Sequence, residues 1–236
     1  MRRFLLELFG GKRNSRRTNK RNPMQWATLL SDYRIGRGEK QYLRDKHRPP
    51  WQYDSDRITF SSAFRRLKDK TQVFPLSSSD YVRTRLTHSV EVSAVGRSLG
   101  TWIGYFLQEQ EHLPKELAAP EEIGAVVAAA NLAHDIGNPP FGHSGEAAIQ
   151  NWCVNSETGV SLLQSMDKLQ SSDFERYDGN AQGFRLLTCL QLYRRCGGMQ
   201  LIAATLGAYS KYPAQSWPTG AQHPHCGRST KKPGFF

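Results

Sequence analysis

Three histidines lie beside residues that could bind a metal ion or move a proton. His134 and Asp135 are adjacent, and His88 ends the string Arg-Thr-Arg-Leu-Thr-His. A neutral imidazole and a carboxylate form a mixed nitrogen and oxygen ligand set, which suits Mn, Fe, Co or Zn, and Mg where phosphates assist. A single His-Asp pair can equally be an ordinary turn in which the carboxylate caps a backbone amide. The upstream His88 favours the metal site.

The third histidine, His143, is followed by Glu146 at a spacing that places both on one helix face. Glu146 could orient or deprotonate a water, with His143 as an acid or a stabiliser of charge. The alternative is a capping arrangement, because glutamate is favoured in the first turn of a helix. Two glycines and two prolines within residues 137–142 predict a tight turn that returns this pair to His134 and Asp135.

Cationic side chains near these positions also allow two interpretations. Arg85 precedes His88 by three residues, so it shares that helix face and could reach a ligand bound at the metal. The pair Arg65 and Arg66 could neutralise phosphates, although solvated surface charge is the better explanation for either of them taken singly. Lys211 and residues 231–232 would contact phosphate only if the fold returns them to the site.

The elements that must position these groups are predicted to be helices, and the fold class is all-α. Ile58, Phe64 and Leu67 share one face of a helix that we expect to start at Asp54 or Ser55, because residues 49–50 are both proline. Further helices are predicted over residues 83–110, 121–134, 144–153, 180–193 and 200–211. Residues 33–54 are expected to form an extended or irregular arm and residues 212–236 a loop.

Composition limits the class of protein. The chain has 236 residues with 38% hydrophobic content, enough for a buried core, and no apolar run approaches the roughly 18 residues of a membrane span. The four cysteines form no C-x-x-C pair, so we expect a reducing, cytoplasmic environment. The net charge of +11 is concentrated at the ends, with +7 in residues 1–22, +7 in residues 179–236 and −3 between them. Basic ends could contact nucleic acid or nucleotide phosphates.

Several common enzyme classes lack support in the sequence. It contains no P-loop, no dinucleotide-binding glycine motif after a strand and no G-x-S-x-G elbow. Residues 1–22 lack the flanks of a signal peptide. We expect them to be a disordered basic leader, or coding sequence upstream of the true start at Met24.

Several longer strings, taken together, resemble one known family. The strings are FRRLKDKTQVF (64–74), RTRLTHSVEV (83–92), LAHDIGNPPFGHSGEAAI (132–149), YDGNAQGFRLL (177–187), SKYP (210–213) and KKPGFF (231–236). Their order and spacing over residues 24–236 resemble the deoxyguanosinetriphosphate triphosphohydrolases (dGTPases), which belong to the HD-domain superfamily of phosphohydrolases. This resemblance implies an all-helical fold, a divalent metal such as Mg²⁺ or Mn²⁺, and hydrolysis of dGTP to deoxyguanosine and tripolyphosphate.

The resemblance also implies individual roles. His88, His134 and Asp135 would be metal ligands, and His143 with Glu146 would be the acid and base at the scissile phosphate. Gln72 and Asn180 would contact the sugar or another part of the nucleotide, and Arg85, Lys211 and Lys232 would contact the triphosphate. The family further implies a homo-oligomer for the full-length protein and single-stranded DNA as an effector.

This chain departs from the family at the metal site. In the family a further Asp, which lies beyond the segment that matches KKPGFF, completes the set of metal ligands. The last acid in this chain is Asp178. We therefore expect residues 23–236 to be the N-terminal portion of a longer enzyme, with exposed apolar surface, poor solubility and weak activity alone. Two alternatives remain: an HD hydrolase of another nucleotide, and a nucleic-acid-binding protein with a vestigial site.

Overall fold

The computed structural model describes residues 25–36, 47–72, 83–192, 197–211 and 216, and these are helical apart from turns and two isolated β-bridges. The predicted leader 1–22 and most of the predicted loop 212–236 lie outside the described residues. The helices are α2 (Trp26–Leu29), α3 (Pro50–Thr59), α4 (Ser62–Arg65), η1 (Arg66–Asp69), α5 (Arg85–Glu109), α6 (Pro120–Ala133), α7 (His143–Asn155), α8 (Glu157–Gln164), α9 (Lys168–Glu175), α10 (Gly179–Arg185), η2 (Leu186–Leu190) and α11 (Ala203–Tyr209). The all-α prediction is therefore confirmed.

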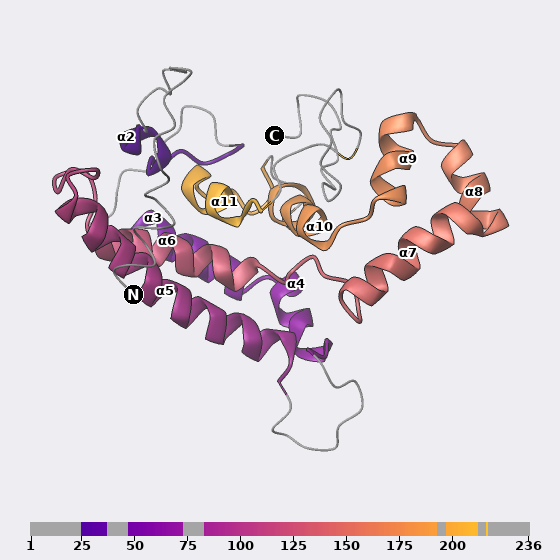
Figure 1. Cartoon of the computed structure of the whole chain (residues 1–236), viewed down its shortest axis with the longest axis horizontal. Helices are drawn as coiled ribbons and strands as arrows, with labels where there is room; N and C mark the ends of the chain where they lie inside the picture. The colour runs from indigo at the N-terminus through magenta and orange to yellow at the C-terminus, as the bar shows by residue number, and fades with distance from the viewer. Residues whose placement is uncertain (1–24, 37–46, 73–82, 193–196, 212–215, 217–236) are drawn as a thin grey trace, which may run out of the picture.

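Helices α5 and α6 form an antiparallel pair along one side of the molecule (Figure 1). They lie close together because α5 turns a row of small residues toward α6. A methyl group added at Gly100 would lie 2.9 Å from the Cα of Gly124, and one at Gly104 would lie 2.7 Å from the Cα of Pro120. The hydroxyl of Ser93 donates to the carbonyl of Ala128 at 2.9 Å. This pairing brings the start of α5 to the end of α6.

The start of α5 is fixed by a capping box, in which Thr84 accepts from the N–H of Thr87 and the Thr87 hydroxyl accepts from the N–H of Thr84. The predicted helix 83–110 is confirmed almost to the residue. Helix α6 begins with Pro120 in its first turn, followed by two glutamates, both of which favour a helix N-terminus.

The core lies between α3, α4, α6, η2 and α11. Its largest members are apolar and almost fully buried: Ile58, Phe64, Leu67, Ile136, Leu187, Met199, Leu201, Leu206 and Tyr209. Ile58, Phe64 and Leu67 are thus buried together, but the prediction that they share one helix is wrong. They lie on α3, α4 and η1, because the helix is interrupted before Ser61, which caps α4. A buried ion pair between Arg34 and Asp54, at 2.5 Å, attaches the N-terminal arm to this core. Burial raises the pKa of Asp54, while the arginine lowers it.

Several predicted boundaries are wrong. Helix α3 begins at Pro50 rather than at Asp54 or Ser55, because a proline in the first helical turn gives up only an N–H that has no partner there. The predicted arm therefore ends at Pro49, and its residues 37–46 lie outside the described residues. The predicted helix 180–193 ends at Leu190, and the predicted helix 200–211 is the shorter α11. Residues 157–175 contain helices α8 and α9, which were not predicted.

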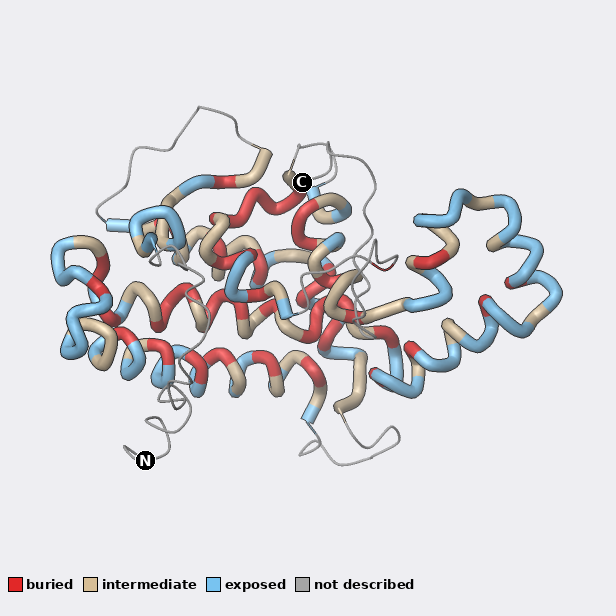
Figure 2. The backbone as a smooth tube through the Cα atoms, turned by 45° about the horizontal axis from the view of Figure 1, so that its top comes forward, coloured by how far each residue is buried: buried red, intermediate tan, exposed pale blue. Residues whose placement is uncertain are grey.

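Helices α7, α8 and α9 pack on one another and project away from the α5–α6 pair, with most of their surface exposed (Figures 1 and 2). Exposed apolar side chains also run along α5, where Val95, Leu99, Trp102 and Ile103 are each 42–59% exposed. A surface of this kind is typical of a contact with another protein surface. None of the described helices is long and apolar enough to cross a membrane.

Candidate metal centre

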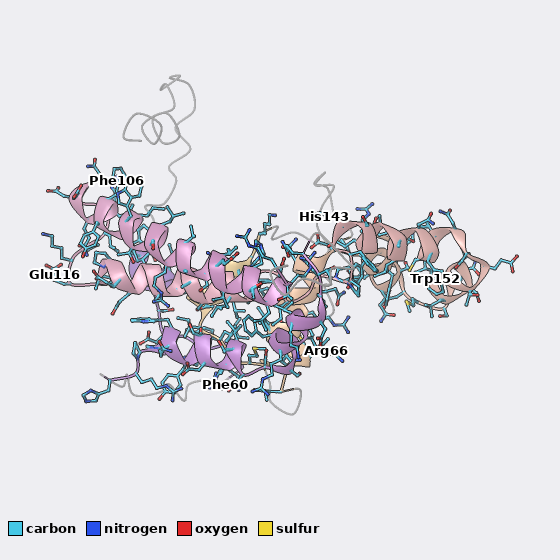
Figure 3. All side chains as sticks on the ribbon, turned by 90° about the horizontal axis from the view of Figure 1, so that it is seen from below. Phe60, Arg66, Phe106, Glu116, His143 and Trp152 are labelled. Atoms are coloured by element: carbon cyan, nitrogen blue, oxygen red, sulfur yellow. The ribbon has the colours of Figure 1, made fainter. Side chains whose placement is uncertain are left out.

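His88, His134 and Asp135 lie together where α5 starts and α6 ends. One ligand atom from each lies within 4.8 Å of the others. The two imidazole rings meet edge to face, with centroids 5.2 Å apart. Asp135 is buried, and the two histidines are partly exposed. In Figure 3, Arg66 and His143 lie between the α5–α6 pair and the projecting helices that carry Trp152, far from Phe106 and Glu116.

Hydrogen bonds fix the orientation of these side chains. Nδ1 of His134 lies 2.8 Å from the carbonyl of Asn131, so this nitrogen carries the proton and Nε2 presents a lone pair. Asp135 accepts from the guanidinium of Arg85 at Oδ2 (2.7 Å) and from the side-chain amide of Asn138 at Oδ1 (2.6 Å). Such partners beyond the ligands hold a metal site in shape before the ion binds.

The donor set fits a divalent cation. Two neutral imidazoles and one carboxylate suit Mn²⁺, Fe²⁺, Co²⁺ or Zn²⁺, and they suit Mg²⁺ when phosphate oxygens supply further ligands. Three protein ligands leave coordination positions for water or for substrate. The residues present therefore fit the divalent metal that the resemblance implies, and His88, His134 and Asp135 would hold it.

The backbone reverses direction in a turn after Asp135, as the glycines and prolines of residues 137–142 predict. Phe141 and Gly142 both have positive φ, at 65° and 56°, and reverse the backbone before α7 begins at His143. Oε2 of Glu146 accepts from Nδ1 of His143 at 2.7 Å, and Oε1 accepts from the N–H of Gly179 at 2.8 Å. The His143 side chain is 98% exposed and that of Glu146 is 11% exposed.

Glu146 also lies near the metal triad. A methyl group built on Gly179 would lie 2.7 Å from Oε1 of Glu146 and 2.3 Å from Oδ1 of Asn138. The side-chain nitrogen of the same asparagine donates to Asp135. The start of α10 therefore lies against both the turn and α7. An ionised glutamate beside an exposed histidine can fix the ring tautomer and leave Nε2 of His143 facing solvent.

The five predicted substrate contacts differ in their surroundings. Arg85 is buried against Asp135, and its Nε has no hydrogen-bond partner among the described residues. Gln72 is half-buried, and its Oε1 is likewise unpartnered within the described part of the chain. Asn180 lies on α10, where its carbonyl accepts from the hydroxyl of Tyr209, and Lys211 is exposed just after α11. Lys232 lies outside the described residues.

Sequence reasoning missed three supporting residues, Asn138, Lys70 and Tyr209. Asn138 lies inside the HDIGNPP string, so its place in the turn was a usable signal. The ammonium of Lys70 donates to the carbonyl of Asn138 at 2.6 Å. Burial lowers the pKa of Lys70, and the positive charges of Arg85 and Arg66 lower it further. Tyr209 is almost fully buried, which raises the pKa of its hydroxyl.

A separate cavity of about 680 Å³ lies between α3 and the segment around Leu190. Its lining includes Arg48, Arg57 and the exposed ring of Phe60, and none of the predicted site residues. Arg48 pairs with Asp56, and Arg57 donates to the carbonyls of Met199 and Gln200. The cavity is therefore no part of the triad described above.

Comparison with known proteins gives one family match and many similar sequences. Residues 85–182 match the HD domain family. A "deoxyguanosinetriphosphate triphosphohydrolase-like protein" of Synechocystis is 50% identical over 222 residues, which are 90% of this chain and 48% of that protein. Proteins of the same name from Pseudomonas aeruginosa and Listeria monocytogenes are 51% and 40% identical, over 80% and 90% of this chain and 42% and 46% of theirs. The chain thus spans about half the length of the curated relatives it matches.

Proposed function

We propose, starting from the HD domain that this chain carries, that it supplies the metal centre of a hydrolase that converts dGTP to deoxyguanosine and tripolyphosphate. The observation that carries the proposal is the grouping of His88, His134 and Asp135 within 4.8 Å, inside the matched segment. The substrate is inferred from the name of the relatives, which share 40–51% identity with the chain. Hydrolysis of another deoxynucleoside triphosphate is the nearest alternative.

The metal, Mg²⁺ or Mn²⁺, would supply Lewis-acid polarisation of phosphate oxygens and lower the pKa of a coordinated water. His88, His134 and Asp135 would hold it, with Arg85 and Asn138 keeping the carboxylate in place. The overall reaction adds water across the bond between the α-phosphorus and the 5′ oxygen, and that oxygen leaves with a proton.

His143 and Glu146 are proposed to transfer that proton to or from the reacting phosphate. Glu146 holds Nδ1 of His143, so Nε2 on the exposed edge of the ring is free to give or take a proton at the reacting phosphate. The exposed ring is accessible to a nucleotide, and the buried carboxylate keeps it oriented. Arg85, Lys211 and Lys232 would neutralise the triphosphate, while Gln72 and Asn180 would contact the sugar.

The cationic surroundings of the site suit a polyanion. Burial and the charges of Arg85 and Arg66 lower the pKa of Lys70, and the carboxylate of Asp135 acts in the opposite direction. A triphosphate placed there would gain charge-assisted hydrogen bonds that a neutral ligand would lack. The unpartnered buried atoms of Arg85 and Gln72 favour a further polar group in this region.

The test compares the chain with two ligand variants, Asp135→Asn and His134→Ala. Each protein is incubated with dGTP and Mn²⁺ or Mg²⁺, and deoxyguanosine and tripolyphosphate are separated by chromatography. We expect slow turnover by the chain, because it offers three ligands, and none by the variants. His112→Ala, at an exposed histidine after α5, is the matched control. Equal product yields from the chain and from Asp135→Asn would overturn the proposal.

A nucleic-acid-binding role is the second candidate, favoured by the +7 charge of residues 1–22 and of residues 179–236. Salt-dependent DNA binding that persists in Asp135→Asn and in a chain starting at Met24 would support it. Assembly into a homo-oligomer, regulation by single-stranded DNA and a cytoplasmic location are proposed for the full-length protein, from the family resemblance.

A further inference from the structure

Lys70 lies between the two elements that carry the proposed metal ligands. Its backbone carbonyl accepts from the N–H of Arg85, the first residue of α5, at 2.9 Å. Its ammonium donates to the carbonyl of Asn138, in the turn after α6, at 2.6 Å. One residue therefore bonds the helix that carries His88 and the turn that follows Asp135.

Both connections lead to the same carboxylate. Arg85, whose N–H bonds the carbonyl of Lys70, donates from its guanidinium to Oδ2 of Asp135 at 2.7 Å. Asn138, whose carbonyl accepts from the ammonium of Lys70, donates from its side-chain amide to Oδ1 of Asp135 at 2.6 Å. The backbone N–H of Asn138 also donates to the carbonyl of Asp135. The carboxylate is thus held on both oxygens by groups that Lys70 itself holds.

The neighbouring backbone adds to this connection. Thr71 and Thr84 form an isolated antiparallel bridge next to the Lys70–Arg85 hydrogen bond, so the chain entering α5 runs beside the chain leaving η1. The ammonium of Lys70 is half-buried and close to Arg66 and Arg85. An apolar side chain of the same length would avoid this desolvation and repulsion, but it could not bond the turn.

We propose that Lys70 is a positioning residue that sets the distance between His88 on α5 and His134 with Asp135 at the end of α6. The proposal rests on the proposed function, because it assigns Lys70 to the same metal centre. It assigns no contact between Lys70 and substrate. A lysine that touched the triphosphate would affect nucleotide affinity, whereas a positioning lysine affects metal affinity before any nucleotide is present.

The experiment measures Mn²⁺ binding to the whole chain without nucleotide, from the electron paramagnetic resonance signal of free Mn²⁺. The variants are Lys70→Met, which keeps the stem and removes the ammonium, and Lys70→Arg, which keeps a donor. Lys68→Met is the matched control, because Lys68 is exposed on the same η1 turn. Asp135→Asn defines the signal of a damaged site, and far-ultraviolet circular dichroism checks the fold of each variant.

We expect Mn²⁺ affinity to fall about 10- to 100-fold in Lys70→Met, the range for lost partners of metal ligands. Lys70→Arg should recover most of it, and Lys68→Met should match the unmodified chain. Unchanged Mn²⁺ affinity in Lys70→Met overturns the proposal, and so does a rise in the KM for dGTP alone, which would make Lys70 a phosphate contact.

If Lys70→Met fails to fold, Lys70→Gln decides the question, because its side chain is neutral and one atom shorter than that of lysine. Weakened Mn²⁺ binding in a folded Lys70→Gln supports positioning by the ammonium, and unchanged binding overturns it. If the unmodified chain binds Mn²⁺ no better than Asp135→Asn, the metal centre itself is overturned, and the role of Lys70 falls with it. Failure of the proposed function is in this way distinguished from failure of the Lys70 proposal.

Discussion

The guanidinium of Arg85 lies 2.7 Å from Oδ2 of Asp135, and both side chains are less than one-tenth exposed. Removing two charges from water is costly, and it is tolerated when the charges pair and make further hydrogen bonds. Here the arginine occupies one oxygen of a carboxylate that we propose as a metal ligand. Arg85 and the cation would therefore both compensate the charge of Asp135.

The first prediction concerns loss of that arginine. Arg85→Met leaves Asp135 buried beside an apolar stem, so the free energy of unfolding without metal should fall by about 3–5 kcal/mol at pH 7. Added Mn²⁺ should restore more stability to this variant than to the unmodified chain, because it replaces the missing positive charge. Urea unfolding with and without Mn²⁺ measures both effects.

Arg97→Met is the control for this experiment, because Arg97 is exposed on the same helix. Its free energy of unfolding should stay within about 0.5 kcal/mol of the unmodified chain. Arg85→Met and Arg97→Met of equal stability without metal would contradict the compensation argument.

A second prediction separates the chemistry of Glu146 from its structural role. In Glu146→Gln the amide oxygen can still accept from Gly179, but the amide nitrogen must donate to Nδ1 of His143, which forces the proton onto Nε2. Turnover of dGTP relative to the unmodified chain should fall about 10²- to 10⁴-fold, with stability nearly unchanged. The His143 tautomer can be followed by ¹⁵N NMR.

Glu146→Ala provides the comparison, because it also leaves the N–H of Gly179 without its acceptor. It should lose about 1–3 kcal/mol of stability in addition to turnover. The assignment of Glu146 would be wrong if Glu146→Gln shifted the His143 tautomer and kept full turnover.

The helices that carry the ligands were predictable, because their signals are local. Periodic apolar residues predicted α5, and glycines and prolines predicted the turn at residues 137–142. The packing face of α5 was not predictable from this pattern. Its apolar residues Val95 and Leu99 are exposed, whereas Gly96 and Gly100 face α6. Hydrophobic periodicity identifies a helix, but close approach of two backbones depends on small residues, which the apolar pattern ignores.

Contacts between distant segments were the other limit. Lys70 and Asn138 are 68 residues apart, and Tyr209 and Asn180 are 29 apart, so neither hydrogen bond has a local signature. The short helices α8 and α9 begin with caps at Ser156 and Asp167, each accepting from a backbone N–H three residues on. These caps were visible in the sequence, and they could have predicted both helices.

A third prediction uses a pair of glycines. A methyl group at Gly137 would lie 2.0 Å from the backbone nitrogen of Gly183 and 2.2 Å from the carbonyl oxygen of Gly179. Gly137→Ala must therefore push α10 away from the turn, which should cost about 1–3 kcal/mol of stability and weaken Mn²⁺ binding. Chemical unfolding and the Mn²⁺ titration measure the two effects.

Gly207→Ala is the opposite case, because a methyl group on Gly207 in α11 meets nothing within 4 Å. Alanine should stabilise this helix by about 1 kcal/mol through its higher helix propensity. If Gly137→Ala were as well tolerated as Gly207→Ala, the close contact between the turn and α10 would be contradicted.

The last prediction is a pH dependence at Tyr209, whose hydroxyl donates to the carbonyl of Asn180 at 3.1 Å. Tyr209→Phe removes this bond, so near neutral pH the variant should be less stable by about 0.5–1.5 kcal/mol. Burial raises the pKa of Tyr209 above the ordinary value of 10.0, so above pH 10 the unfolded chain loses this proton and the folded chain keeps it. The free energy of unfolding of the unmodified chain then falls as pH rises.

Phenylalanine has no proton to lose, so the advantage of the unmodified chain over Tyr209→Phe should be constant from pH 7 to 9 and shrink between pH 10 and 11. Urea unfolding across this range measures the difference, and Tyr33→Phe, at an exposed ring, should follow the unmodified chain throughout. A difference that stayed constant to pH 11 would mean that the phenol of Tyr209 titrates alike in the folded and unfolded chains. That result would contradict its burial against α10, and with it the proposed support for Asn180 at the site.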